Sequence, residues 1–265
     1  PSSRGGITST CTTTMGSAYT RGTSPLTWRD ACTAPGAIRV LAGSDDGTYD
    51  AALPFTFYFY NAPNTTAGIA SNGIVTLGAP ATYVWTNEPL PYASAPNSIF
   101  AFWDDLYQRS GVCVATFGAA PNRQYVVQWD DNFYYPPGDP TAENAHLNLE
   151  VVLTETTNTI DVLYGSPFSG QGDRATGESA TIGIQQGTGS SFDQVSYNTA
   201  GFVSPGRSIR WTPSTGRTTC EQGVYARTYE ASCSNPRQTA IWGQFNYSSI
   251  VPQGASIEFE VRAGN

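Results

Sequence analysis

Two pairs of adjacent aspartates stand out in the sequence, because each pair follows a tryptophan at the end of a run rich in apolar residues. Asp104 and Asp105 lie in IFAFWDDLY, and Asp130 and Asp131 lie in QWDDNFYY. Carboxylate oxygens are the ligands that Ca²⁺ prefers, so two such pairs at neighbouring strand ends could surround one ion. We therefore name these four aspartates as candidate metal ligands and Ca²⁺ as the candidate cofactor.

Two other interpretations of these carboxylates stay open. Adjacent residues on a strand point to opposite faces, so each aspartate could accept backbone N–H groups in its own turn or pair with an arginine such as Arg123. A glycoside hydrolase would need two carboxyl groups roughly 5–9.5 Å apart across a cleft. The single histidine, His146, is accompanied by no G-x-S-x-G motif. We predict no catalytic residues, with a glycan-degrading enzyme as the less favoured alternative.

A third acidic stretch, SDDGTYD, contains Asp45, Asp46 and Asp50. It has the oxygen density of a Ca²⁺ loop, but no glutamate closes it in the EF-hand register. We favour an ordinary Asp-Gly turn here.

Aromatic residues form a second kind of candidate site. The stretch NFYYPPGDP is predicted to expose Phe133, Tyr134 and Tyr135 in a loop between strands. Sugar rings stack on such side chains, while aspartate and asparagine bind the hydroxyl groups. In the competing interpretation, which we favour, the three rings fold back as a small loop core. The three residues are kept as the candidate ligand-binding set.

Five cysteines lie at positions 11, 32, 113, 220 and 233, without a C-x-x-C pair. This spacing does not fit a zinc site, and in an exported chain disulfides are expected. Proximity in sequence suggests that Cys11 pairs with Cys32 and Cys220 with Cys233. Cys113 is then left over, to be buried, paired outside the chain or paired differently.

Composition indicates an extracellular protein. Charged residues make up 13% of the chain, against roughly 25% in an average domain, and no lysine occurs. The net charge of −8 argues against nucleic acid or an anionic membrane surface as a partner. No apolar run approaches the roughly 20 residues that span a bilayer, so we expect no membrane insertion.

Alternation with a period of two predicts strands throughout the chain. PFTFYFY places Phe55, Phe57 and Phe59 on one face, and roughly ten such segments, closed by Gly, Pro, Asn or Asp, predict an all-β, two-sheet, jelly-roll-like sandwich. We expect this domain over residues 1–212, with a Thr/Ser-rich start, then a linker over 213–219. Residues 220–265 are expected to form a small C-terminal β module, incomplete or strand-exchanging.

The order of motifs over residues 53–187 resembles the nidogen-type extracellular sandwich domain and its bacterial relatives. The succession is SNGIVTLG, NEPLP, PNSIFAFWDDL, NRQYVVQW, NLEVVLTETTNTIDVLYG and ATIGIQQG. The tail, with AIWGQFNY and SIEFEVR, looks like a module of large secreted surface proteins of high-GC bacteria. The resemblance implies export and a role in adhesion or surface architecture, without an established catalytic centre.

We therefore predict a secreted or cell-surface structural or adhesive protein. One form of it is a fibre subunit that self-associates, or joins other surface proteins, by exchanging edge strands. A carbohydrate-binding module that uses the loop aromatics is the first alternative.

Overall fold

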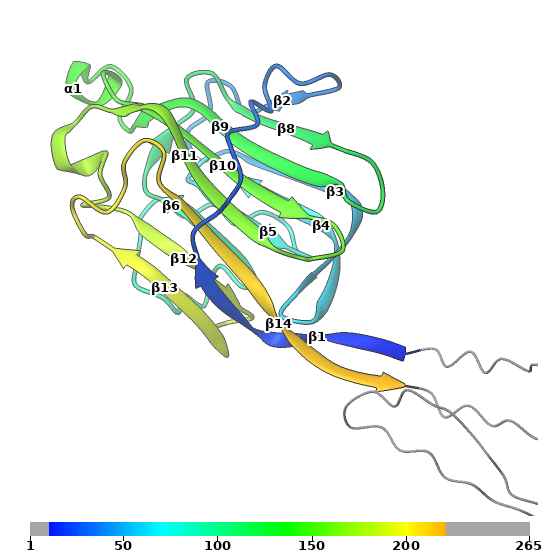
Figure 1. Ribbon diagram of the computed structural model, residues 1–265. Helices are drawn as coiled ribbons and strands as arrows, with labels where there is room; N and C mark the ends of the chain where they lie inside the picture. Colours follow the sequence, from blue (N-terminus) through cyan, green and yellow to red (C-terminus); the bar gives the residue numbers. More distant parts are fainter. Residues whose placement is uncertain (1–10, 221–265) are drawn as a thin grey trace, which may run out of the picture. The chain divides into compact units, whose positions relative to one another are not determined.

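The computed structural model describes residues 11–220 and confirms an all-β fold of two antiparallel sheets (Figure 1). The eight-stranded sheet, called sheet A, has the order β1 (Cys11–Gly22), β14 (Ser208–Cys220), β11 (Ile160–Ser169), β10 (His146–Thr154), β9 (Gln124–Tyr134), β8 (Val112–Phe117) and β2 (Ile38–Val40), with β7 (Leu106–Tyr107) paired to β9. The six-stranded sheet, sheet B, has the order β13 (Ser191–Tyr197), β12 (Thr181–Gln186), β6 (Ser98–Trp103), β5 (Ile74–Leu77), β4 (Ala62–Ala70) and β3 (Thr48–Phe59).

Helical structure within residues 11–220 is limited to one short α-helix, α1 (Pro140–Glu143), and one 3₁₀ turn, Gly172–Arg174. No helix in this part of the chain has the length and apolarity needed to span a bilayer.

One compact unit comprises Met15–Gly216, and a second comprises Pro1–Thr14 with Arg217–Asn265. Residues 213–219, predicted to form a linker, lie within β14, since their threonines favour extended backbone. The predicted C-terminal module, residues 220–265, lies outside the described residues except for its first residue.

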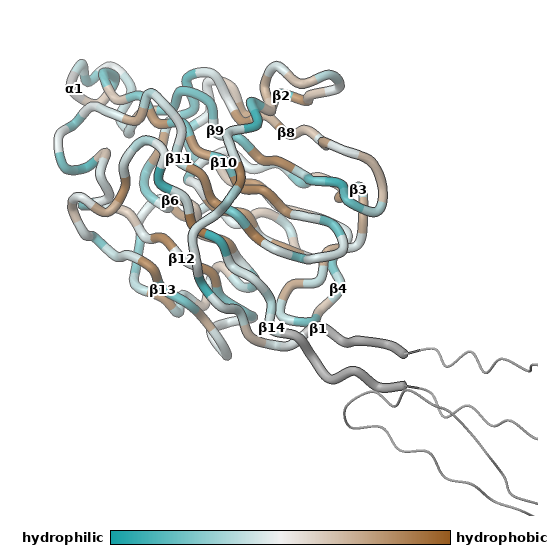
Figure 2. Tube along the Cα trace, in the orientation of Figure 1, coloured by the Kyte–Doolittle hydropathy of each residue, from teal (hydrophilic) through white to brown (hydrophobic). Residues whose placement is uncertain are grey.

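The core between the sheets follows from the alternation in the sequence. In β3, Phe55, Phe57 and Phe59 are buried while Thr56 and Tyr58 are exposed, as predicted. Burying a large apolar side chain contributes roughly 1.5–3 kcal/mol, so the apolar stripes of both sheets drive their stacking. Figure 2 shows these apolar stretches running along the strands of both sheets.

The outer face of sheet A is also covered. Cys113, Gln128, Glu150 and Leu163 stand side by side on β8, β9, β10 and β11. Residues 23–37, called the first cover segment, run across them, as the blue trace in Figure 1 shows. A strand covered on both faces is buried along its length, and in β10 every residue from Leu147 to Leu153 is buried, including the polar Asn148 and Glu150.

The outer face of sheet B carries its own cover. Residues 79–97, called the second cover segment, place Leu90 and Ala95 against Ile74, Phe100 and Trp103. Side-chain amides fix the segment to the sheet, and Gln185 alone makes three hydrogen bonds of 2.7–2.8 Å to backbone groups of residues 92 and 95.

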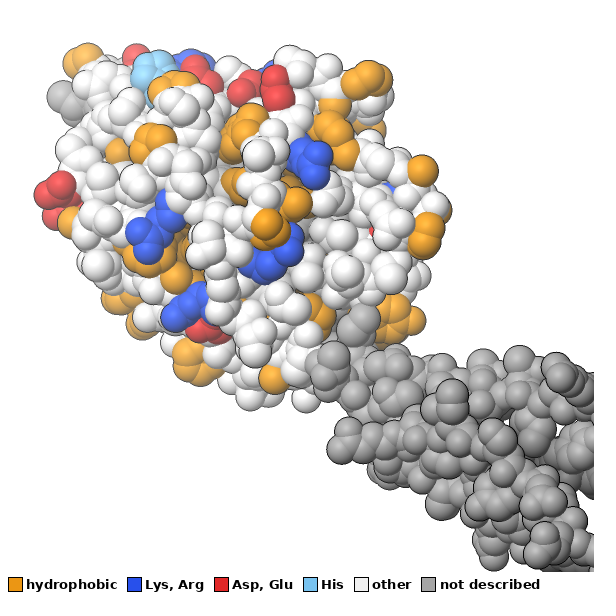
Figure 3. Space-filling view, viewed as in Figure 1, with side chains coloured by type: hydrophobic (Ala, Val, Ile, Leu, Met, Phe, Trp, Pro, Cys, Tyr) orange, Lys and Arg blue, Asp and Glu red, His pale blue; other side chains and the backbone are white. Residues whose placement is uncertain are grey.

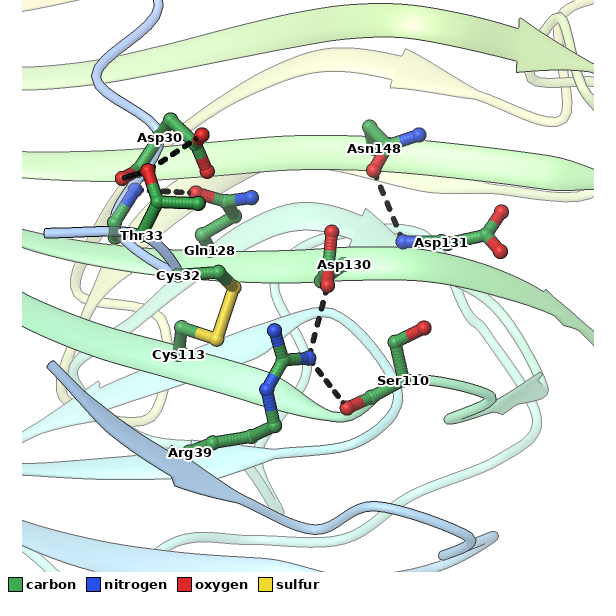
Figure 4. The surroundings of a disulfide bond; sticks show 11 residues. Asp30, Cys32, Thr33, Arg39, Ser110, Cys113, Gln128, Asp130, Asp131 and Asn148 are labelled. Atoms are coloured by element: carbon green, nitrogen blue, oxygen red, sulfur yellow. Dashed lines mark hydrogen bonds and ion pairs between the residues drawn. A yellow bond between two sulfur atoms is a disulfide. The ribbon is translucent and has the colours of Figure 1, made fainter.

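The disulfide links Cys32 to Cys113, with the sulfurs 2.06 Å apart (Figure 4). The predicted Cys11–Cys32 pair is therefore wrong. The reason is topological, because β1, which begins at Cys11, lies at the edge of sheet A opposite to β2 and β8. The first cover segment brings Cys32 across the sheet to β8. The predicted Cys220–Cys233 pair lies outside the described residues.

Candidate functional site

Asp104 is a buried structural residue at the end of β6. Its carboxylate accepts hydrogen bonds from Arg174 Nη2 at 3.1 Å, from Ser179 Oγ at 2.5 Å and from the Asp105 backbone N–H at 2.8 Å. Burial raises the pKa of Asp104, against the opposing effect of Arg174. The Arg174 guanidinium also lies 3.9 Å from the centre of the Tyr134 ring. These contacts already occupy both oxygens of Asp104, which leaves it poorly suited to ligate a metal.

Asp105 points into a different environment from its neighbour. Its carboxylate lies with those of Asp45 and Asp46, and one oxygen from each of the three lies within 4.8 Å of the others. Among residues 11–220 this is the only group of three or more acidic, histidine or cysteine side chains that comes so close.

Asp130 and Asp131 on β9 also separate. Asp130 Oδ2 accepts a hydrogen bond from Arg39 Nη1 at 2.8 Å, as Figure 4 shows. Asp131 adopts a positive φ of 52° beside a register shift in β10, forms an ion pair with Arg109 at 3.1 Å and lies in hydrogen-bond contact with His146 Nδ1 at 2.6 Å. The four predicted metal ligands thus have four separate sets of partners, and the predicted four-carboxylate site is not assembled.

A polar cavity of about 440 Å³ opens beside this second pair. It is lined by Trp28, Asp30, Gln128, Asp130, Asp131, His146, Asn148, Ser166 and Pro167. Most of its polar atoms have internal partners: Gln128 Oε1 accepts the Ala31 N–H at 2.6 Å, and Asn148 Oδ1 accepts the Asp131 N–H at 2.9 Å. The polar groups of the cavity wall are therefore engaged mainly within the protein, and one of these contacts, Ala31 to Gln128, holds the first cover segment on the sheet.

Glu150, next to Gln128 on this face, has no exposed surface. Its two carboxylate oxygens accept the Arg29 backbone N–H at 3.1 and 3.2 Å. Burial raises the pKa of Glu150 to about 7, and the backbone hydrogen bonds only partly oppose this. A glutamate inside the apolar run NLEVVL is the sequence signal that could have identified this residue.

The aromatic triplet is mostly buried. Phe133 and Tyr134 are 4% and 0% exposed, which agrees with the favoured interpretation that these rings are buried and contradicts the alternative that a loop exposes them. The cause is that β9 continues to Tyr134 and pairs there with β7. Tyr135 alone is exposed, at 43%.

A different aromatic pair is displayed at the surface. Tyr83 and Trp85, in the second cover segment, are 60% and 56% exposed. Val84 between them is held in place, because its carbonyl accepts a hydrogen bond from the buried Trp103 Nε1 at 2.7 Å. This pair was not predicted from the sequence, because it lies between the motifs SNGIVTLG and NEPLP and belongs to neither.

The face of the molecule in Figure 3 is formed mostly by uncharged polar side chains and backbone, with charged side chains in small separate groups.

The family model described as NIDO related matches residues 18–220. The chain belongs to the NIDO-related family. This membership confirms the nidogen-type resemblance and extends it to both ends of the sandwich. No curated protein matches the chain, and no solved structure does. NIDO-related domains are typically extracellular, and the Cys32–Cys113 disulfide is compatible with a secreted protein. Membership therefore suggests an extracellular structural or adhesive module.

Proposed function

We propose that this NIDO-related protein is a secreted or cell-surface structural and adhesive subunit that assembles with further copies of itself through the edge strand β1. The observation that carries the proposal is a difference among the four strands at the sheet edges. Natural proteins usually blunt an edge with proline, lysine, a bulge or a short strand, because unpaired backbone groups attract other strands.

Three of the four edges carry such a device. β2 is only three residues long. β3 contains Pro54 and a register shift against β4, and β13 has a register shift against β12. β1 is 12 residues long, CTTTMGSAYTRG, and contains no proline, lysine or acidic residue. Within residues 11–220 its only sheet neighbour is β14.

The second half of β1 is firmly seated on the sandwich. The Tyr19 ring packs edge-on against Tyr60 at 4.9 Å and lies 5.8 Å from Phe59, and Arg21 forms a 3.0 Å ion pair with Asp193. A seated strand with an open edge is a template to which a strand of a second copy can add.

Light scattering after gel filtration, over a concentration series, tests this assembly. The full chain should form dimers or larger species, and negative-stain imaging should show them. Ala18→Lys on β1 should abolish the assembly, because an exposed lysine opposes edge pairing. The matched control is Ala52→Lys, an exposed alanine on the blunted edge strand β3, which should assemble normally. A chain that stays monomeric at every concentration, or equal assembly of both variants, would refute the proposal.

Glycan binding is the second candidate, and the exposed pair Tyr83 and Trp85 favours it. Two aromatic rings beside an anchored residue lose little conformational freedom on binding, and they offer apolar faces on which sugars stack. A glycan array tests this idea. Trp85→Ala should lose retention while Tyr135→Ala keeps it, and the reverse result would favour the triplet named from the sequence.

The same glycans test the enzyme alternative. Release of reducing ends that Asp131→Asn abolishes would favour a glycan-degrading enzyme, whereas unchanged glycans would count against it.

A further inference from the structure

Three segments distant in sequence meet at the turn that follows residue 43. The Gly43 N–H donates to the Gln108 carbonyl at 2.8 Å, and the Gln108 N–H donates to the Ser44 carbonyl at 2.9 Å. The Ser71 N–H donates to the Gly47 carbonyl at 2.9 Å. The SDDG turn is thereby fixed against the start of the β4–β5 turn and the residues that follow β7.

Three carboxylates gather at this junction. Asp45, Asp46 and Asp105 form the cluster described above, and within residues 11–220 no arginine or histidine makes an ion pair with any of them. Burial, followed by the charges of Asp45 and Asp46, raises the pKa of Asp105 to about 6. Burial and the charge of Asp46 also raise the pKa of Asp45. The cluster is therefore electrostatically unfavourable as it stands.

The same junction contains buried oxygen atoms that accept no hydrogen bond. They are Gln108 Oε1, Ser71 Oγ and Asp45 Oδ1. Gln108 and Ser71 have no exposed surface, and Gln108 Nε2 donates to the Ser71 carbonyl at 2.6 Å, which fixes the amide. Buried acceptors without a donor are destabilising, and a cation satisfies such oxygens. The Gln108 and Ser71 oxygens are not members of the carboxylate cluster, so they are an observation independent of it.

We propose that Asp45, Asp46 and Asp105 bind one Ca²⁺ ion, with Gln108 Oε1 as a neutral ligand. Ca²⁺ takes six to eight oxygen ligands at roughly 2.3–2.6 Å, so oxygens on one ion lie within roughly 5 Å of each other. The separation of at most 4.8 Å in the cluster satisfies this requirement. Water completes the shell on the side of Asp46, which is exposed.

Asn72 is a positioning residue for this site. Its Nδ2 donates to Asp46 Oδ1 at 2.9 Å, and its Oδ1 accepts the Leu106 N–H at 3.0 Å. The bound ion would thus tie the SDDG turn to the chain that follows β6. Of the four metal ligands predicted from the sequence, Asp105 alone belongs to this site.

Calorimetric titration of the chelator-treated full chain with CaCl₂ tests the proposal. One Ca²⁺ should bind with a Kd of roughly 10⁻⁴–10⁻³ M, the range of extracellular modules. MgCl₂ should bind more weakly, because Mg²⁺ demands a stricter octahedral shell. Asp105→Asn should weaken Ca²⁺ binding about tenfold or more, since it removes a charged ligand. The charge-matched control is Asp173→Asn, an exposed aspartate outside the cluster, which should bind as the unmodified protein does.

Thermal unfolding of the same proteins gives a second readout with a change of sign. With chelator, Asp105→Asn should melt at or above the temperature of the unmodified protein, because repulsion is relieved. With saturating CaCl₂ the Asp105→Asn variant should melt at a lower temperature than the unmodified protein. Asp46→Asn, at an exposed position, should behave in the same way. It keeps the test valid if Asp105→Asn does not fold. Absence of Ca²⁺ binding by the unmodified protein, or equal binding by Asp105→Asn and Asp173→Asn, would overturn the proposal.

Discussion

The two cover segments perform the same task on opposite faces of the sandwich, but by different chemistry. The first, residues 23–37, is held on sheet A by a disulfide, by the buried carboxylate of Glu150 and by Gln128. The second, residues 79–97, is held on sheet B by the neutral amides of Gln185 and Gln194 and by the indole of Trp103, and at its start by the exposed carboxylate of Asp50, which accepts the Ala81 N–H at 2.8 Å. The first cover should therefore respond to reductant and to pH, whereas the buried contacts of the second, made by Gln185, Gln194 and Trp103, should respond to neither.

The largest expected effect comes from removing the disulfide. The Cys32→Ala/Cys113→Ala double variant opens a link between residues 81 positions apart, and should lower the free energy of unfolding by roughly 2–5 kcal/mol. Urea unfolding measures the loss. Dithiothreitol should lower the free energy of unfolding of the unmodified protein by reducing this disulfide. It should not have this effect on the double variant. A double variant as stable as the unmodified protein would mean that the first cover needs no covalent link.

The second cover should be weakened by Gln185→Ala. Gln185 is fully buried and its amide satisfies both backbone groups of Tyr92 and the carbonyl of Ala95. Leaving such groups without partners should cost roughly 2–3 kcal/mol, at any pH and with or without reductant. Gln186→Ala, at the partly exposed neighbouring position, is the matched control and should change urea unfolding little. A loss that varies with pH would contradict the contrast between the covers.

The strand pattern could be predicted from the sequence because it is local. Period-two alternation placed the phenylalanines of β3 on the inner face, and adjacency correctly implied that Asp104 and Asp105 point apart. Local alternation could not show whether the two aspartate pairs lie close enough to form one site. β6, which precedes Asp104, belongs to sheet B, whereas Asp130 and Asp131 lie on β9 of sheet A. Sheet membership depends on long-range pairing.

The covers also escaped prediction, for a related reason. Neither segment has strong periodicity, and each is positioned by single side chains on strands far away in sequence, such as Gln128 and Gln185. The same long-range crossing carries Cys32 to Cys113. A separate long-range contact, between the turn after residue 43 and the residues after β7, brings Asp45 to Asp105 at the candidate Ca²⁺ site.

The most specific expected effect, confined to one range of pH, concerns the first cover. The pKa of Glu150 is raised from 4.5 to about 7 in the folded protein, so folding favours the protonated form. The stability that this group contributes is fully present below about pH 4.5 and is lost as the pH rises to about 7. At about 1.4 kcal/mol per pKa unit the loss should be roughly 3 kcal/mol, and Glu150→Gln should remove that part of the pH dependence.

Urea unfolding at several pH values across this window measures the effect as the difference between the variant and the unmodified protein. Other carboxyl groups, including Asp105, titrate equally in both proteins and cancel in that difference. Glu155→Gln is the control, because hydrogen bonding to Arg123 lowers the pKa of Glu155 to about 2. The stability that Glu155 contributes is lost only as the pH falls through that value, so its removal should leave the slope between about pH 4.5 and about pH 7 unchanged. An unchanged slope in Glu150→Gln would show instead that the first cover is held by its disulfide and Gln128, without a titrating group, and the two covers would then differ in redox chemistry alone.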